Sequence, residues 1–161
     1  MSENQGSGEK LIASNPTARS DYFIEEVVEA GMALTGTEVK SLRMQTPNIK
    51  DAFVDIRPLG QGLEAWLTNA HIAPYSHGNI WNHDPKRRRK LLLHRHQIER
   101  MFGAVTQKGL TIVPLRMYFK KGKAKIELGL GRGKKKYDKR EDLKKKSAQR
   151  EMDLARKSRN K

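Results

Sequence analysis

Two neighbouring runs of alternating apolar and polar residues constrain the fold of this chain most strongly. From Lys123 to Leu130, Ala, Ile and Leu alternate with Lys and Glu, which is the period of a strand with one buried face. Residues 111–119 alternate in the same way, and Lys120-Lys121-Gly122 supplies a turn between the runs. The side chains of 111–119 expected on the buried face are Val113, Leu115, Met117 and Phe119. Together the runs predict an antiparallel hairpin.

Shorter patterns complete the expected architecture. Three further strands are predicted at residues 22–29, 52–57 and 63–68. Thr35 and Glu38 have the spacing of a capping box and predict a short helix that ends near Met44. A second helix is predicted over residues 92–107, where apolar side chains recur at helical spacing. Many short strands with a helix between hairpins favour a mainly β fold, a small closed antiparallel barrel of the oligonucleotide-binding type with flanking helices.

The last thirty residues differ in kind from the rest. Residues 132–161 carry fourteen Lys or Arg against five Asp or Glu, and so hold +9 of the formal charge of +15. Few apolar side chains are present to offset the entropy of ordering this segment. We therefore expect a tail that is disordered when free and helical when bound to a polyanion, supported by acid–base pairs at i,i+4. The expected organisation is a disordered N-terminus (1–9), an RNA-binding β-barrel domain (10–131) and a basic C-terminal tail (132–161).

Charge indicates the class of partner. Residues 1–131 hold nineteen basic and thirteen acidic residues, a net +6, and a second basic cluster lies at Lys86–Lys90. Nucleic acid is favoured over a membrane surface, because the tail lacks the apolar face of a membrane-binding helix. The absence of cysteine excludes disulfides, cysteine-based zinc sites and a thiol nucleophile. No apolar stretch approaches the roughly 20 residues of a membrane span, and we expect a soluble, cytoplasmic protein.

Other candidate chemistry is weak. The five histidines match no zinc-binding spacing, and the glycine-rich segment Gly129–Gly133 lacks the dinucleotide-binding spacing and is interpreted as a flexible exit from the barrel. The acidic residues are scattered among many cations, which does not favour a two-metal nuclease site. We expect no metal, no cofactor and no catalytic residue. Three aromatic side chains could stack on bases or belong to the core: Tyr22, Trp66 and Trp81.

Four segments, in order, carry a more specific signal: 29–31, 34–43, 89–94 and 133–140. They resemble the SmpB family, and the resemblance runs from about Ile12 to the end of the chain. It implies a six-stranded barrel that binds the tRNA-like domain of transfer-messenger RNA (SsrA RNA) and has no enzymatic turnover. It further implies delivery with elongation factor Tu to stalled ribosomes in trans-translation, where the tail probes the empty mRNA channel near the decoding centre.

The resemblance also implies particular residues. Family contacts to transfer-messenger RNA match Glu29, Leu92 and His94, although Glu29 could instead cap or pair with a nearby lysine, Leu92 could be core and His94 could cap a helix. Phosphate contacts at the root of the tail are implied for Lys134, Lys135 and Lys136. The segment expected near the decoding centre is Tyr137, Asp138, Lys139 and Arg140, with Tyr137 stacking on a base.

One departure and two rival functions accompany the resemblance. Family members often carry basic residues after the asparagine that matches Asn15, whereas this chain has Pro16 and Thr17, which weakens the case for phosphate contacts there. A basic structural ribosomal RNA-binding protein is the alternative function. An RNA-processing enzyme is the other rival, and the lack of a credible acid, base or metal set argues against it.

Overall fold

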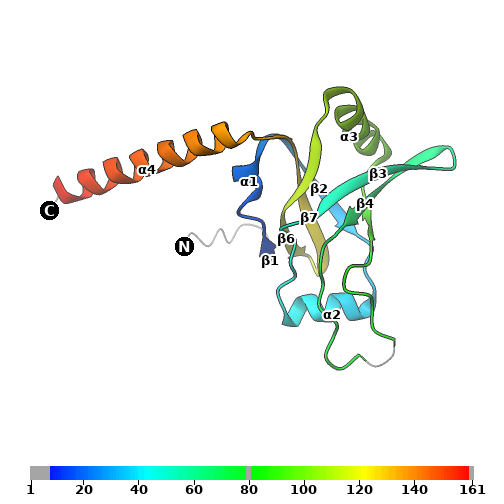
Figure 1. Cartoon of the computed structure of the whole chain (residues 1–161). Coiled ribbons are helices and arrows are strands. Elements are labelled where there is room, and N and C mark those ends of the chain that lie inside the picture. Colours follow the sequence, from blue (N-terminus) through cyan, green and yellow to red (C-terminus); the bar gives the residue numbers. More distant parts are fainter. Residues whose placement is uncertain (1–7, 79–80, 160–161) are drawn as a thin grey trace.

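The computed structural model describes residues 8–78 and 81–159. Its strands form one seven-stranded antiparallel sheet in the order β1-β6-β7-β2-β5-β4-β3. In chain order the elements are β1 (Glu9–Ser14), α1 (Ala18–Asp21), β2 (Tyr22–Met32), α2 (Gly36–Met44), β3 (Phe53–Leu59), β4 (Gly62–Thr68), β5 (Arg89–Leu92), α3 (Arg95–Lys108), β6 (Thr111–Lys120), β7 (Lys123–Gly133) and α4 (Lys136–Arg159). Figure 1 shows α4 extending from the side of the molecule that carries α1, away from the β3–β4 hairpin.

The predicted closed barrel is wrong, because the sheet has two free ends, β1 and β3. β3 comes close to β6, but one edge of β6 pairs with β7 and the other pairs with β1, from Glu9↔Lys120 to Ser14↔Arg116. The sequence reasoning had not identified β1 as a strand. Since a strand has only two hydrogen-bonding edges, β1 occupies the backbone groups that β3 would need for closure.

The short strand β5 also makes closure of the sheet into a barrel less favourable, because few backbone pairs join it to its neighbours. It joins β2 through two residue pairs, Gly31↔Leu92 and Met32↔Leu91, and joins β4 through two more. The helix predicted over residues 92–107 in fact begins at Arg95, because β5 occupies the residues before it. A four-residue strand is a narrow link, so the β3–β4 hairpin projects from the main sheet as an arm (Figure 1).

The predicted hairpin of β6 and β7 is confirmed. The prediction that four alternating side chains of β6 share one buried face is wrong. Val113 and Leu115 pack with Ala18 of α1 in a small second cluster, whereas Met117 and Phe119 belong to the main core. The cause is a register shift between Pro114 and Arg116 opposite β7. A bulge adds one residue, and because side chains alternate with period two, the faces exchange beyond it.

The glycines of β7 hold strands close together and do not form the flexible exit predicted for 129–133. A Cβ at Gly131 would lie 2.5 Å from the carbonyl oxygen of Phe23, and one at Gly129 would lie 3.1 Å from Ile24. β2 has a register shift between Ile24 and Glu26 opposite this stretch. Any side chain at Gly131 would push β2 and β7 apart at the bulge, where their backbones come close together.

A buried ion pair joins α2 to β5. Glu38 and Arg89 are both fully buried, and the Arg89 Nε donates to a carboxylate oxygen of Glu38. Arg89 Nη1 also donates to the carbonyl of Ala70 at 2.7 Å. The other carboxylate oxygen of Glu38 accepts from the backbone N–H of Thr35 at 3.0 Å, which confirms the predicted capping box. Two of the four segments that carry the resemblance to a known family, 34–43 and 89–94, therefore meet in the core.

The tail is helical in the structure of the chain without a partner. The prediction of a tail that is disordered when free is therefore wrong. α4 is 24 residues long, contains no Gly or Pro, and exceeds the roughly 12–15 residues at which an isolated helix becomes marginally stable. Asp138 lies in its first turn and basic residues in its last, as the helix dipole favours. The i,i+4 pairs predicted to support this helix are Glu141–Lys145, Asp142–Lys146 and Asp153–Lys157. None of them forms an ion pair in the described part of the chain, and Asp142 pairs with Lys134 instead. From Leu143 to Arg159 every side chain is exposed.

Candidate nucleic-acid interface

All three residues expected to contact transfer-messenger RNA line one groove of about 1150 Å³. Its walls come from β2, the turn into β4, β5 and the start of α3. Glu29 lies on β2, Leu92 ends β5 and His94 precedes α3. Because β5 pairs with β2, residues more than sixty positions apart in the sequence face one hollow.

Leu92 is not a core residue. Its side chain is 54% exposed, and it faces Gly31 across the β2–β5 ladder. A Cβ at Gly31 would lie 3.3 Å from the Leu92 Cβ and 3.6 Å from the Lys125 Nζ. Gly31 thus leaves the floor of the groove open, with an apolar side chain on one wall and an ammonium group beside it.

His94 is the N-cap residue of α3, but its ring remains exposed. The backbone N–H of His94 donates to the Gln97 Oε1 at 3.0 Å. The imidazole is stacked with that of His96, with ring centroids 5.6 Å apart and planes inclined by 10°. The helix start is thus stabilised through the backbone, which leaves an exposed aromatic face that a base could stack on.

The side chain of Glu29, on β2, contacts two residues of β6. The Tyr118 hydroxyl donates to the Glu29 Oε2, and the Lys120 Nζ lies 3.5 Å from the same oxygen. The hydrogen bond from Tyr118 is the main reason that the pKa of Glu29 lies below its ordinary value; burial opposes it and Lys120 assists it. Burial, with the Glu29 bond, raises the pKa of Tyr118. Glu29 is therefore an oriented carboxylate with 39% of its side chain still exposed.

Cations outnumber acids along the groove. Lys90, Arg95, Arg100 and Lys125 line it together with Glu29 and Glu64. Glu64 pairs with Lys90 at 3.1 Å. The arrangement combines fixed positive charge, an exposed leucine, an exposed imidazole and one oriented acceptor, which together could bind a phosphate backbone and an unpaired base.

The root of the tail lies elsewhere, beside α1. The Lys134 Nζ pairs with Asp142 and donates to the carbonyl of Arg19 at 3.0 Å. Lys139 pairs with Asp21 at 3.0 Å, whereas Lys135 and Arg140 are exposed and Asp138 is half-buried. The side chains of Lys136 and Tyr137 lie outside the described part of the structure, so the roles assigned to them stay predictions.

Much of the second basic cluster stabilises the fold. Arg89 is buried against Glu38, Arg87 also pairs with Glu38, and Arg88 lies 5.4 Å from the Trp66 ring centroid. The exposed aromatic residue of this region is Trp81, at 86% exposure, while Trp66 is half-buried. Tyr22 packs against the small cluster beneath α1. Charge counting along the sequence therefore overestimated the cations available to RNA in this cluster.

Comparison with known proteins decides the family. The model of the family described as "SmpB protein" matches residues 12–158. The chain belongs to the SmpB family. The SsrA-binding protein of Pelobacter propionicus is 58% identical over 153 residues, covering 95% of this chain and 98% of that protein. The SsrA-binding proteins of Geobacter metallireducens and Lysinibacillus sphaericus are 58% and 53% identical over 154 and 156 residues, covering 96% and 97% of this chain and 98% and 97% of theirs.

A solved structure supports the same assignment. One chain of a structure described as "tmRNA-SmpB: a journey to the center of the bacterial ribosome" is 51% identical to this chain, with a TM-score of 0.61. The match covers 77% of this chain and 85% of that one. The resemblance read from four sequence segments is thereby confirmed.

Asn15 and Thr17, where the resemblance implied a departure from the family's pattern, lie in a structural turn. Asn15 is buried, and its Nδ2 donates to the carbonyl of Pro114 at 3.1 Å. The Thr17 hydroxyl donates to the Asn15 Oδ1 at 3.0 Å. Asn15 and Thr17 thus connect the start of α1 to β6.

Within the described residues no cluster of His, Asp or Glu could hold a metal ion, and no described helix is long and apolar enough to cross a membrane.

Sequence reasoning missed several groove residues of this SmpB-family chain. The predicted RNA contacts did not include Lys125 or Arg100, which line the groove, or Tyr118, which orients Glu29. The signal for Lys125 was present, since it is an outward position of a clearly alternating strand. Nothing in the sequence indicated the partnership of Tyr118 and Glu29, because it depends on which strands are neighbours in the sheet.

Proposed function

We propose that this chain binds the tRNA-like domain of transfer-messenger RNA and is required for its delivery to stalled ribosomes in trans-translation. The observation that carries the proposal is 58% identity to an SsrA-binding protein across 95% of the chain. The relatives are named for binding SsrA RNA, and the solved neighbour is described with transfer-messenger RNA and the ribosome. The protein acts by binding RNA, without enzymatic turnover, in the cytoplasm.

The groove that holds Glu29, Leu92 and His94 is the proposed contact for the tRNA-like domain. Three properties support it: surrounding cations attract phosphates, the imidazole of His94 offers a stacking face, and the carboxylate of Glu29 accepts hydrogen bonds in a fixed direction. A carboxylate makes binding specific, because it accepts a hydrogen bond from a nucleotide amino or hydroxyl group and repels a phosphate placed in the same position.

The tail is proposed to probe the empty mRNA channel. α4 presents basic side chains all along its exposed length, so it complements a tunnel lined by RNA, and a messenger already in the channel would exclude it by volume. Lys135 and Lys136 are proposed phosphate contacts at its root. Asp138, Lys139 and Arg140, with Tyr137, are proposed to act near the decoding centre, and elongation factor Tu is proposed to accompany the complex.

The decisive experiment measures RNA binding and tagging together. The purified protein is titrated with an in vitro transcript of the tRNA-like domain and with an elongator tRNA of equal length, over a range of salt concentrations. We expect preference for the tRNA-like domain to persist at high salt, because shape and base contacts release no counterions. Addition of the protein to a reconstituted translation system with a truncated mRNA should restore the tag on the stalled peptide.

Two outcomes would contradict the proposal. Equal affinity for both RNAs at every salt concentration would make the chain a nonspecific polycation. Stoichiometric retention on salt-washed ribosomes, with no effect on tagging, would instead favour the structural ribosomal protein. Sequencing the RNA that co-purifies with the protein separates the two, since only the proposed function predicts one enriched small RNA.

A further inference from the structure

Trp66 lies on the outward face of β3, β4 and β5, the face directed away from the main core. Its neighbours on β4, Ala65 and Leu67, are buried in that core. Because side chains alternate along a strand, the Trp66 ring points to the opposite face. In the sheet Trp66 is paired with Asp55 of β3 and with Lys90 of β5. The ring is half-buried, so part of it remains accessible.

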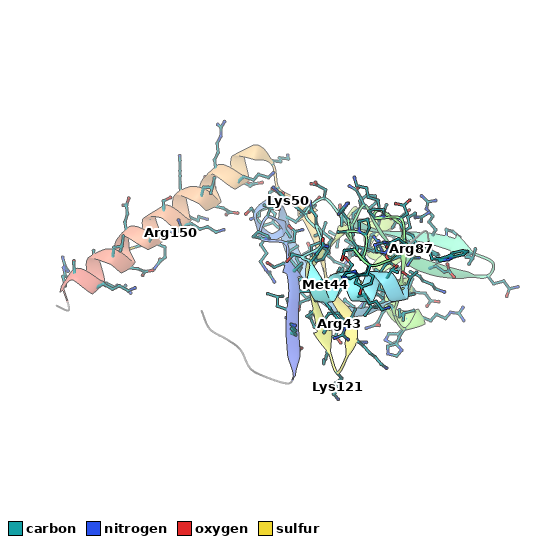
Figure 2. The ribbon with its side chains drawn as sticks, turned by 90° about the horizontal axis from the view of Figure 1, so that it is seen from below. Arg43, Met44, Lys50, Arg87, Lys121 and Arg150 are labelled. Atoms are coloured by element: carbon teal, nitrogen blue, oxygen red, sulfur yellow. The ribbon has the colours of Figure 1, made fainter. Side chains whose placement is uncertain are left out.

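A guanidinium group lies beside the Trp66 ring. The Cζ of Arg88 is 5.4 Å from the ring centroid, within the range of a cation–π contact. The Arg88 Nη2 is 3.8 Å from the Oδ2 of Asp55, and this carboxylate also pairs with Arg57 at 2.6 Å. Figure 2 shows Arg87, the residue before Arg88, on the side of the body from which the β3–β4 hairpin projects. The Arg88 side chain is 41% exposed, so a ligand can reach a guanidinium that Trp66 and Asp55 hold on this face.

The outward face is continuous with the groove. Within the segment 88–92, Arg89 and Leu91 are buried, so the alternating residues Lys90 and Leu92 point outward along with Arg88. Both Lys90 and Leu92 line the groove. An RNA that occupies the groove therefore has the outward face of the three strands directly beside it.

We propose that the outward face of β3, β4 and β5 binds a single-stranded segment of RNA, with one base stacked against the Trp66 ring and the Arg88 guanidinium. Unpaired bases stack on aromatic rings and on guanidinium planes, whereas the bases of a duplex are already stacked on each other. Arg88 and the exposed Lys90 attract phosphates. Phe53, two positions before Asp55 on the same face and 42% exposed, offers a second ring.

The fluorescence of Trp66 reports on base stacking at this site. The chain has two tryptophans, and Trp81→Phe leaves Trp66 as the single reporter. Trp81 is 86% exposed, so this substitution removes no core packing. The Trp81→Phe protein is titrated at low salt with a short oligouridine, which forms no duplex. We expect saturable quenching of the Trp66 fluorescence, because a base comes to lie against the ring.

Arg88→Lys, made in the Trp81→Phe protein, separates stacking from charge, because it keeps the cation and removes the guanidinium plane. We expect it to weaken oligouridine binding at least about fivefold, the loss of one stacking contact. Arg57→Lys is the matched control: it makes the same exchange in the other guanidinium that pairs with Asp55, but Arg57 is paired with Glu64 in the sheet and not with Trp66. Its affinity for oligouridine should stay at the parent value, and thermal melting should be equal in all three proteins.

Three results would overturn the proposal. Absence of quenching at every oligouridine concentration would leave this face to a protein partner. An unchanged affinity in Arg88→Lys would show that the guanidinium plane does not bind a base. An equal loss in Arg57→Lys would mean that the effect is not specific to the residue beside Trp66.

The assignment of the single strand to transfer-messenger RNA rests on the proposed function, whereas the oligouridine titration does not. If oligouridine quenches Trp66 fluorescence but the protein shows no preference for the tRNA-like domain over an elongator tRNA, the single-strand site stands and the proposed function fails. If the tRNA-like domain is preferred but oligouridine leaves the fluorescence unchanged, the proposed function stands and the single-strand site is wrong.

Discussion

At the residue scale, the groove depends on a tyrosine that RNA would never touch. Tyr118 is buried, and its hydroxyl orients the carboxylate of Glu29. The guanidinium of Arg116 lies 4.3 Å from the centroid of its ring and pairs with Glu127 at 2.9 Å. The carboxylate is thus positioned by neighbours on β6, and its direction is set before any ligand arrives.

Tyr118→Phe should raise the pKa of Glu29 toward its ordinary value of 4.5. In the folded protein that pKa is lowered, so the charged carboxylate stabilises the fold above pH 4.5 and the contribution is lost as pH falls through the folded pKa. Without the hydroxyl, this part of the acid dependence should shrink. NMR titration of the Glu29 side chain in both proteins measures the change, and an unmoved pKa would show that Tyr118 does not hold the carboxylate.

Glu29→Ala and His94→Ala should each weaken binding of the tRNA-like domain by about 1–3 kcal/mol while the fold stays intact. Both side chains are at least partly exposed, so neither truncation leaves a cavity in the core. Calorimetric titration gives the affinity and thermal melting gives the stability. Glu99→Ala, another exposed carboxylate, located on α3, is the comparison variant. A fall in melting temperature with unchanged affinity would instead favour purely structural roles.

At the scale of elements, the buried Glu38–Arg89 pair holds α2 against β5. Burial by itself would raise the pKa of Glu38, but hydrogen bonds from Thr35, Arg87 and Arg89 outweigh it and the pKa lies below its ordinary value. A buried charge is tolerated only where its partner and further hydrogen bonds compensate. Since β5 forms one wall of the groove, this pair links the core to the RNA site.

Glu38→Gln should destabilise the protein by about 3–5 kcal/mol, because it leaves Arg89 buried and without its countercharge. Urea unfolding followed by circular dichroism measures the loss. The matched control is Glu99→Gln, which removes an exposed i,i+4 pair with Arg95 and should cost no more than about 0.5 kcal/mol. Equal effects of the two substitutions would mean that burial of the Glu38 pair is unimportant.

Ala148→Pro should break α4 near its middle at a cost of about 3 kcal/mol of helix stability, with charge unchanged. Far-UV circular dichroism should show the loss of helix, and the unfolding of the sheet should be unaffected because the side chains around Ala148 are exposed. Tagging should fall if the tail acts as a helix. Normal tagging by this variant would show that the arm acts through its charge alone.

At the scale of the whole molecule, the two proposed tasks lie at separate places. The groove is built by β2, β4, β5, α3 and the start of β7, whereas α4 leaves beside α1, away from the β3–β4 hairpin (Figure 1). The main core draws its buried residues from the strands, from α2 and α3 and from the loops, and includes none of the described side chains of α4. Binding and delivery should therefore be separable.

Removal of residues 132–161 should leave binding of the tRNA-like domain largely intact and abolish tagging. The remaining chain keeps the groove and its core, although it loses Arg132, which pairs with Glu25 at 3.2 Å. Affinity for RNA and tagging of a stalled peptide are measured on the same preparations. A truncated protein that tags normally would reduce the tail to a nonspecific anchor.

The sequence by itself determined the local structure, the charge distribution and the family. The alternation in β7, the capping box at Thr35 and the motif segments are all local patterns, and local patterns can be read along the chain. Only the tertiary structure decided what depends on neighbours in space. β1 occupies the edge of β6 and keeps the sheet open, a bulge beside Pro114 turns Val113 and Leu115 to the second cluster, and Lys134 faces Asp142. Edge pairing, bulges and ion pairs are set by contacts between distant segments, and composition and periodicity do not specify such contacts.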